Sequence, residues 1–269
     1  MAEDAALPPA DPIVAQLRRV GPEMSLDTGG LRFRDEEAVA LIRHYVDLLR
    51  AATPAAGAAL AATTIAIGEA AMASYRVRQP FACKKGCGWC CFQTVDVTAP
   101  EIFLIARALR GEAGGDAPAI LSKAAAVTER QARRVVDPAK PLNLQTPCVF
   151  LERGVCGIHA IRPLPCRYYA SFDVGACLKR LSDADAEIPF PAAHLPLRIW
   201  QEGLLLAAFV ATGRATCHYE LGGAVAAVLA DPGIEARWYA GDDGLAGFAV
   251  LPGSDALAEA ARWRGLAGV

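Results

Sequence analysis

The spacing of apolar residues along the chain predicts mostly helices. From Asp35 onward, Val39, Ile42 and Val46 recur at intervals of three and four residues, which places them on one face of a helix. An Ala-rich apolar stretch over residues 55–76 predicts a second helix. Further helical patterns cover residues 102–109, 117–136, 197–212, 221–230 and 254–265. The predicted fold class is therefore mainly α.

Local signals mark one helix start and one small β-ribbon. Thr98-Ala-Pro-Glu101 has the composition of a capping box with Pro in the first turn, so a helix is expected to begin there. Residues 148–151 and 155–158 are short β-like runs, and the intervening Glu152-Arg153-Gly154 suits a hairpin turn. We expect a helical protein with a small β-ribbon and a cysteine-rich metal-binding loop.

Composition divides the chain into four expected parts. Residues 1–30 are rich in Pro, Asp and Gly and are expected to form a flexible lead-in. Residues 31–80 are expected to hold the N-terminal helices, residues 81–180 the cysteine-rich domain, and residues 181–269 a C-terminal helical extension. The cysteine-rich part is thus expected to join helices to the ribbon.

One apolar stretch, residues 51–73, is close in length to a membrane span and carries a single charge, at Glu69. It consists mostly of Ala, Thr and Gly, contains Pro54, and lacks the Leu, Ile and Phe content that membrane insertion favours. A buried helix is therefore favoured over a membrane span.

The charge balance excludes some classes of partner. The 269 residues carry a formal net charge of −2 and the pI is about 6.1, so no basic excess marks a nucleic-acid or membrane-surface binder. The acidic N-terminus has no apolar run behind it and does not resemble a secretory signal. We therefore expect a cytoplasmic protein, in a compartment that keeps thiols reduced. We expect no nucleic-acid or membrane partner, and the sequence identifies no protein partner.

Four of the nine cysteines lie within nine positions, from Cys83 to Cys91. Thiolates this dense repel one another unless a cation neutralises them, so the run forms either a disulfide knot or a soft-metal site. The odd cysteine count and the absence of a recognisable export signal both favour a metal. The remaining alternative is that cysteines act as small buried hydrophobes, which suits Cys217 best.

Two blocks of cysteines make up the candidate metal site. The first has the spacing C-x3-C-x2-C-C and the second C-x7-C-x9-C, with one more cysteine beyond it. The candidate ligands are Cys83, Cys87, Cys90, Cys91, Cys148, Cys156, Cys166 and Cys177. Gly86 and Gly88 permit a tight bend around an ion. Because four thiolates on one divalent ion leave a net negative charge, Lys84, Lys85 and Arg167 are expected to offset it.

Neighbouring Cys90 and Cys91 point in different directions if this stretch is extended, so they are not expected to bind one ion as equals. Cys90 completes the spacing with Cys83 and Cys87, which leaves Cys91 for a second ion or for the later block.

The metal is expected to be zinc or iron. A C-x2-C pair is typical of zinc, whereas three cysteines at x3 and x2 spacing equally indicate an iron–sulfur loop. Eight cysteines would fill two four-thiolate sites, or one iron–sulfur cluster and one zinc site.

Other chemistry has weaker signals. The first-block spacing is also that of a radical S-adenosylmethionine loop, but the chain continues into helices rather than the βα units of a barrel. His159 is either a metal ligand or an ordinary imidazole on the ribbon, and the second interpretation is favoured. Neither an acid nor an oxyanion signature accompanies the adjacent Cys217 and His218, so no catalytic residue is assigned.

The two blocks together resemble the YkgJ-like cysteine-cluster family, described as a zinc- or iron-chelating domain. The matching motifs are Cys83-x3-Cys87-x2-Cys90-Cys91, Thr98-Ala-Pro-Glu101, Cys148-Val-Phe-Leu151, Cys156-Gly-Ile-His159 and Arg162-Pro-Leu-Pro-Cys-Arg-Tyr-Tyr169. The resemblance covers about residues 81–180 and implies metal binding through these cysteines, with Cys177 as the late one.

A flagellin lysine N-methylase carries a similar cluster, so an enzyme with a metal centre is the alternative function. Against it, the chain lacks a strand-Gly-x-Gly loop that opens a helix, which a cofactor-binding α/β domain usually has.

Overall fold

The computed structural model describes residues 23–24, 31–32, 35–74, 79–111, 120, 147–183 and 185–269. Within these ranges the fold is mainly α, as predicted. Most of the expected lead-in over residues 1–30 lies outside them, although Glu23–Met24 (β1) pairs with Leu31–Arg32 (β2). The predicted helix over residues 117–136 also lies outside the described residues, Ile120 excepted.

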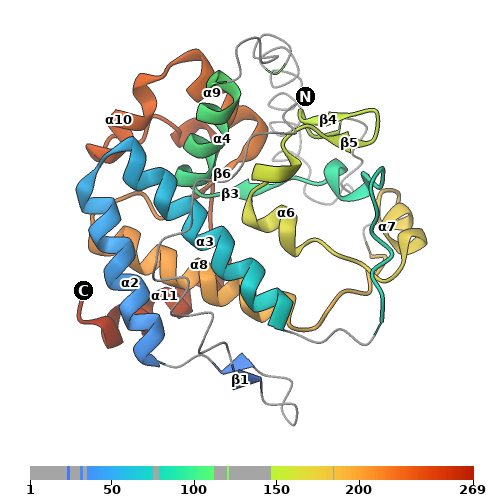
Figure 1. Ribbon diagram of the computed structural model, residues 1–269, viewed down its shortest axis with the longest axis horizontal. Helices are drawn as coiled ribbons and strands as arrows, with labels where there is room; N and C mark the ends of the chain where they lie inside the picture. Colours follow the sequence, from blue (N-terminus) through green and yellow to red (C-terminus); the bar gives the residue numbers. More distant parts are fainter. Residues whose placement is uncertain are drawn as a thin grey trace.

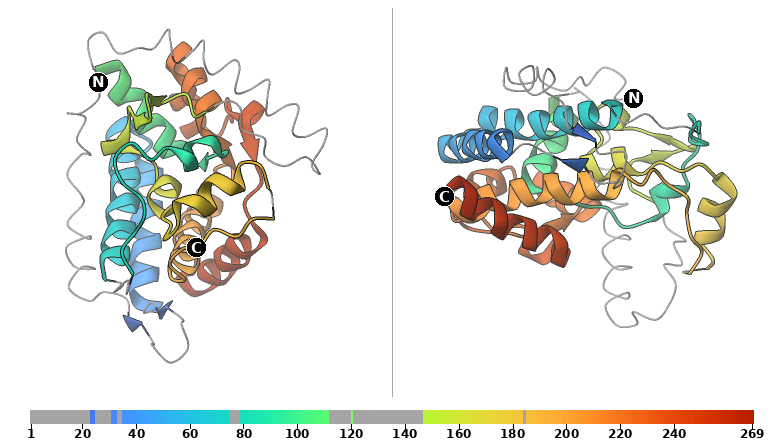
Figure 2. Two further views of the ribbon diagram at one scale, coloured as in Figure 1. Left: turned by 90° about the vertical axis from the view of Figure 1, so that its right-hand side faces the viewer. Right: turned by 90° about the horizontal axis from the view of Figure 1, so that it is seen from below.

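Four helices in two layers form a helical body (Figures 1 and 2). One layer holds α2 (Asp35–Ala51) and α3 (Pro54–Ser74), and the other holds α8 (His194–Ala211) and α11 (Ser254–Ala267). The predicted apolar face of α2 is buried, with Ile42 fully enclosed, because it packs against α8, α3 and α11. α8 contacts all three of the other helices and forms the centre of the body.

Helix α3 is long and apolar enough to cross a membrane by length and composition alone. In the structure, 67% of its Pro54–Ala73 stretch is buried against the rest of the molecule. Ile65 is fully enclosed and the adjacent Thr64 hydroxyl donates to the Leu60 carbonyl oxygen at 2.8 Å. These are the features expected of a core helix.

A second helical group packs on a small antiparallel sheet. The sheet has the order β3-β6-β7, and Asp96 is paired with Glu220 in its register. A ring contact of Trp238 with Phe209 on α8, at 5.7 Å between centroids, joins the group to the body, and one with Phe103 at the same distance lies within the group. The elements are β3 (Asp96–Val97), α4 (Ala99–Gly111), β6 (His218–Glu220), α9 (Leu221–Ala230), α10 (Gly233–Tyr239), a 3-10 helix η3 (Ala246–Phe248) and β7 (Ala249–Val250).

The residues that carry most of the cysteines form a separate region, which we call the cysteine lobe (residues 79–92 and 147–183). It lies beside the helical body, with α7 at its outer edge (Figure 1). The predicted ribbon is present: Leu151 pairs with Cys156 across the hairpin. The elements are the 3-10 helix η1 (Trp89–Phe92), β4 (Leu151–Glu152), β5 (Val155–Cys156), the 3-10 helix η2 (His159–Ile161), α6 (Leu164–Tyr168) and α7 (Val174–Arg180).

Candidate metal centre

The two cysteine blocks, which are far apart in the sequence, meet in the cysteine lobe. The backbone N–H of Cys148 donates to the carbonyl oxygen of Cys91 at 2.7 Å. The first loop packs directly on the hairpin, because a Cβ added at Gly88 would lie 3.1 Å from Leu151 Cδ1. All nine cysteines are free thiols.

Five of these thiols form an inner group, namely Cys90, Cys91, Cys148, Cys156 and Cys166. A hydrogen bond with the Cys91 side chain, followed by burial, raises the pKa of the Cys90 thiol far above its usual range. Burial raises the pKa of Cys148 to about 12, and the charges of Cys156 and Cys90 add to the effect. Burial and then nearby thiolates also raise the pKa of Cys166. Cys90, Cys148 and Cys166 therefore lie near other thiols of the group and hold their protons at neutral pH.

Three more thiols form an outer group, namely Cys83, Cys87 and Cys177. The Ser171 backbone N–H donates to Cys83 Sγ at 3.3 Å, and the Ser171 side chain hydrogen-bonds to Cys177. Burial raises the pKa of Cys177, and the charges of Cys83 and Cys87 contribute in the same direction. Cys83 is exposed and the other two are half-buried. Ser171 thus joins the start of the first block to α7, which sequence reasoning did not anticipate.

The charge of Cys90 reaches thiols of both groups, so the expectation drawn from spacing, that it joins Cys83 and Cys87, stays a prediction. Its charge acts on Cys148, Cys156 and Cys166 alike, so it lies beside the later block. It also acts on Cys177 and therefore stands between the two groups. The backbone turn over Trp89–Phe92, which is 3-10 helical rather than extended, sets this orientation.

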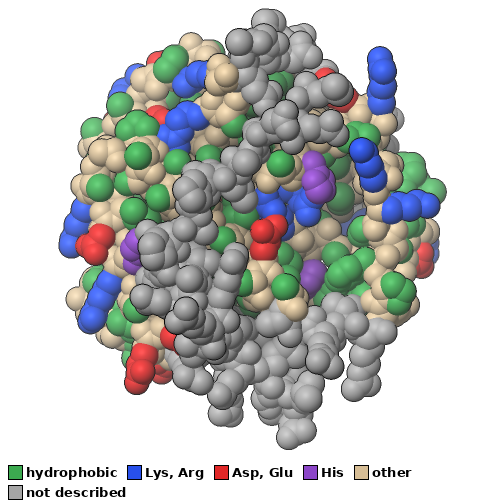
Figure 3. All heavy atoms as spheres, viewed as in Figure 1, with side chains coloured by type: hydrophobic (Ala, Val, Ile, Leu, Met, Phe, Trp, Pro, Cys, Tyr) green, Lys and Arg blue, Asp and Glu red, His purple; other side chains and the backbone are tan. Residues whose placement is uncertain are grey.

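The positive charge closest to the inner thiols comes from Arg162, which lowers the pKa of both Cys90 and Cys156 against the larger effects that raise them. Arg167, the expected counter-charge, is bound instead to the Glu69 carboxylate and to the carbonyl oxygens of Arg162 and Ala160, the last at 2.8 Å. Lys84 and Lys85 are exposed on the outer loop. Lys and Arg side chains project from this edge of the molecule in Figure 3.

His159 is in contact with Arg162, and burial followed by the charge of Arg162 lowers its pKa. This places the imidazole on the outside of the ribbon, beside a cation. Cys217 packs against the hydrophobic core, with its sulfur 3.8 Å from Asp243 Oδ2. Neither residue joins the two thiol groups.

The Glu101 carboxylate connects the cysteine lobe to the body. It accepts hydrogen bonds from the Thr98 N–H at 3.0 Å and the Thr98 hydroxyl at 2.8 Å, which confirms the predicted capping box. Its other oxygen accepts from the Leu164 N–H at 2.7 Å, at the start of the helix that carries Cys166. Glu101 therefore fixes α6, and with it an inner thiol, against α4.

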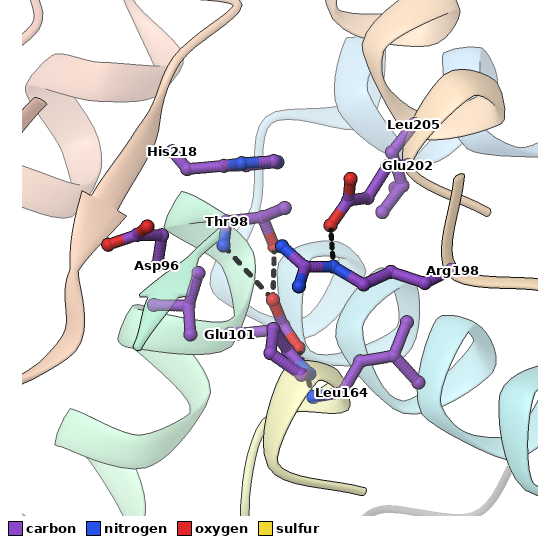
Figure 4. Close-up of a pocket in the computed structure, with 10 residues that line it drawn as sticks. Asp96, Thr98, Glu101, Leu164, Arg198, Glu202, Leu205 and His218 are labelled. Atoms are coloured by element: carbon purple, nitrogen blue, oxygen red, sulfur yellow. Dashed lines mark hydrogen bonds and ion pairs between the residues drawn. The ribbon is translucent and has the colours of Figure 1, made fainter. Parts of the chain in front are cut away.

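A small polar cleft lies behind α6, between β3, α4, α6, α8 and β6 (Figure 4). In it Arg198 Nε donates to Glu202 Oε1 at 2.6 Å, while Glu101 is held by Thr98 and Leu164. The Glu101 bond to Leu164 joins α4 to α6, whereas the Arg198–Glu202 pair lies within α8.

Buried thiols with raised pKa values are groups whose ionisation a bound cation would favour, and clustered thiols are typical ligands of zinc and iron. The donor set therefore fits a soft metal ion. Within the part of the chain that the structure describes, no three His, Cys, Asp or Glu side chains are already gathered into a complete ligand set. Metal binding would thus require the thiols to draw together.

Comparison with known families gives one match. Residues 82–185 match the CxxCxxCC family model, which is described as a putative zinc- or iron-chelating domain. The matched segment includes all eight candidate ligands. Neither the curated proteins nor the solved structures gave a significant match to the chain.

Proposed function

Because residues 82–185 form a cysteine-cluster domain of the zinc- or iron-chelating kind, we propose that this protein binds zinc or iron through that domain, in the cytoplasm. The ligands are drawn from Cys83, Cys87, Cys90, Cys91, Cys148, Cys156, Cys166 and Cys177. With iron, the same thiolates suit an iron–sulfur cluster. No observation on the described residues favours an enzyme over metal binding as such.

The observation that carries the proposal is the convergence of two distant cysteine blocks in one lobe. Eight free thiols lie there, and the pKa values of Cys90, Cys148 and Cys166 are raised. Gathering protonated thiols in one half-buried place brings little stability by itself. A metal ion that displaces their protons forms bonds with the sulfur atoms, and its binding free energy then stabilises the fold.

The first loop has the backbone freedom needed to close around an ion. Gly86 has a φ of +88°, in the left-handed region that glycine adopts without strain. A Cβ at this position would meet nothing within 4 Å, although the backbone of Gly86 itself packs against Gly154 of the hairpin. The side of the loop on which that Cβ would lie is therefore open.

The experiment that tests the proposal is anaerobic purification followed by elemental analysis and an absorption spectrum. We expect zinc or iron in stoichiometric amounts, and charge-transfer absorption with acid-labile sulfide if the iron is in a cluster. Thiol titration of denatured, chelator-treated protein without reductant should find most of the nine cysteines free. Four disulfides with no metal would contradict the proposal.

A further inference from the structure

We infer that the cysteine lobe holds two metal ions of different accessibility, one enclosed by the inner group and one held by the outer group with a coordination position open to other molecules. This inference rests on the proposed metal binding and adds how the thiols are divided. The inner site is expected to retain its ion, and the outer site is expected to exchange its ion with other molecules.

The inner group is enclosed by the fold on several sides. Cys156 is fixed on β5 by its pairing with Leu151, and Cys148 is tied by its backbone to Cys91. Cys166 lies on α6, whose first N–H is held by the buried Glu101 carboxylate. Cys90, Cys148, Cys156 and Cys166 supply four thiols, which is the number of a closed tetrahedral site. An ion there would be shielded from solvent and slow to leave.

The outer group is built differently. Its thiols come from the exposed loop and from α7, a short helix at the edge of the lobe (Figure 1). Ser171 holds the two segments together: its N–H donates to Cys83 Sγ, and its carbonyl oxygen accepts from the Ala82 N–H at 2.8 Å. Cys83 is exposed to solvent. None of these three cysteines packs against the hydrophobic core, whereas Cys148, Cys156 and Cys166 do.

Three thiolates leave one position of a tetrahedral ion free for water or for a ligand from another molecule. The exposed Lys84 and Lys85 next to the outer thiols would offset the remaining negative charge. An ion in this position can be passed on by ligand exchange, since an incoming thiol or carboxylate can bind before a protein thiolate leaves. The outer site is thus suited to transfer of the ion.

The test uses the full chain loaded with Zn²⁺ under reducing, anaerobic conditions. We expect about two zinc ions per chain, and release to a colorimetric chelator in two phases, the second at least about tenfold slower than the first. Cys177→Ser should remove the fast phase, leave the slow phase, and lower the melting temperature less than Cys156→Ser does. Cys156→Ser should remove the slow-releasing ion and lower the melting temperature. Cys217→Ser is the matched control and should change neither phase.

A measurement on the unmodified protein guards against a variant that fails to fold. Titration with Co²⁺ should give two successive sets of visible bands, from sites with different numbers of thiolate ligands. A single ion, or loss of all metal in both Cys177→Ser and Cys156→Ser, would show one shared centre and overturn the division into two sites. A chain that binds no metal at all would instead refute the proposed function.

Discussion

Glu101 shows how much a single side chain does at the base of the cysteine lobe. It is only 3% exposed, yet its carboxylate receives three hydrogen bonds from two separate elements. The capping role is visible in the sequence, because Thr98 and Glu101 have the capping-box spacing. The hydrogen bond to Leu164 cannot be seen in the sequence, because it joins residues that are 63 positions apart.

Replacing Glu101 should therefore destabilise the fold without removing a thiol. In Glu101→Gln, the amide cannot accept from both the Thr98 and Leu164 N–H groups, and we expect the free energy of unfolding to fall by roughly 1–3 kcal/mol. Urea denaturation measures it. Glu187→Gln, at an exposed position, is the control and should stay within about 0.5 kcal/mol of the original protein. Equal midpoints for the two variants would contradict the anchoring role.

Cys90 and Cys91 are adjacent but are expected to contribute unequally. The charge of Cys90 acts on all three thiols of the later block, whereas the Cys91 thiol is hydrogen-bonded to Cys90 itself. Cys90→Ser should thus lose the enclosed ion, and Cys91→Ser should keep it. The test is to measure the number of metal ions bound per chain in the two variants and in the unmodified protein. The same loss from both would mean that the two thiols are equivalent ligands.

Metal affinity should rise steeply with pH. Cys90, Cys148 and Cys166 have pKa values above their usual range, so they are protonated at neutral pH and must lose their protons to bind. Raising the pH lowers that cost, and each ligating thiol should release about one proton. Calorimetric titration with Zn²⁺ at pH 7, in buffers of different ionisation enthalpy, counts the protons. A count near zero would show that the thiols are already ionised.

At the scale of elements, the β4–β5 hairpin positions two of the inner thiols. Its turn residues, Arg153 and Gly154, both have positive φ values of 48° and 79°. Such turns favour Asn followed by Gly, because both tolerate the left-handed region. A Cβ at Gly154 would also lie 3.3 Å from the Gly86 carbonyl oxygen in the first cysteine loop. The turn therefore sets both the hairpin and its contact with that loop.

Gly154→Ala should lower the free energy of unfolding by roughly 1–2 kcal/mol, because an L side chain is strained at this φ. It should also weaken metal retention by pushing the hairpin away from the first loop. Arg153→Asn at the preceding position is expected to be neutral or slightly stabilising. Thermal unfolding of the metal-loaded variants provides the comparison. An unchanged Gly154→Ala protein would show that the turn relaxes freely.

The close approach of α8 and α11 predicts that two glycine-to-alanine substitutions change the stability in opposite directions. A Cβ at Gly203 would lie 2.6 Å from Glu259 Cβ, whereas a Cβ at Gly265 would meet nothing within 4 Å. Gly203→Ala should cost roughly 1–3 kcal/mol through overpacking. Gly265→Ala should gain up to about 1 kcal/mol from helix propensity. Urea midpoints that shift in the same direction would contradict this packing argument.

Local patterns predicted most elements but not how they meet. The helix at residues 221–230 has the expected bounds, and α8 begins only three residues before the predicted 197. The three-stranded sheet was missed, because strands of two or three residues are too short to display an alternating pattern. The 3-10 turn at Trp89–Phe92 was also missed, because the directions of Cys90 and Cys91 were argued for an extended stretch.

At the scale of the whole molecule, α8 joins the cysteine lobe to the helical body. Near its start, His194 Nδ1 lies 2.9 Å from the Tyr168 carbonyl oxygen, and the Tyr168 hydroxyl bonds to Gln201 about two turns further on. Gln201 Nε2 in turn donates to the Thr64 carbonyl oxygen on α3 at 2.9 Å. The remaining turns of α8 pack in the core with α11. Lobe and body therefore share one rigid helix.

Metal removal should consequently affect the body as well as the lobe. Trp238 and Trp263 are buried in the helical part of the molecule, outside the cysteine lobe. We expect chelation to lower the temperature at which their near-ultraviolet circular dichroism is lost, in a single transition shared with the far-ultraviolet signal. Two separate transitions, with the tryptophan signal unaffected by the chelator, would show that the parts unfold independently.

Because the lobe and the body share α8, the segment that is recognised by its cysteine motif is shorter than the segment needed for folding. The segment that matches the family ends at residue 185, before α8 begins. Cut out at those limits, it would keep every candidate ligand but leave Leu164 and Tyr168, which are buried in the full chain, facing water. The motif can thus be recognised across proteins as a unit of chemistry, while the smallest piece that folds extends to the helices on either side. A gene fusion or a shortened expression clone cut at the limits of the motif would contain the candidate ligands but lack the helices that pack against them.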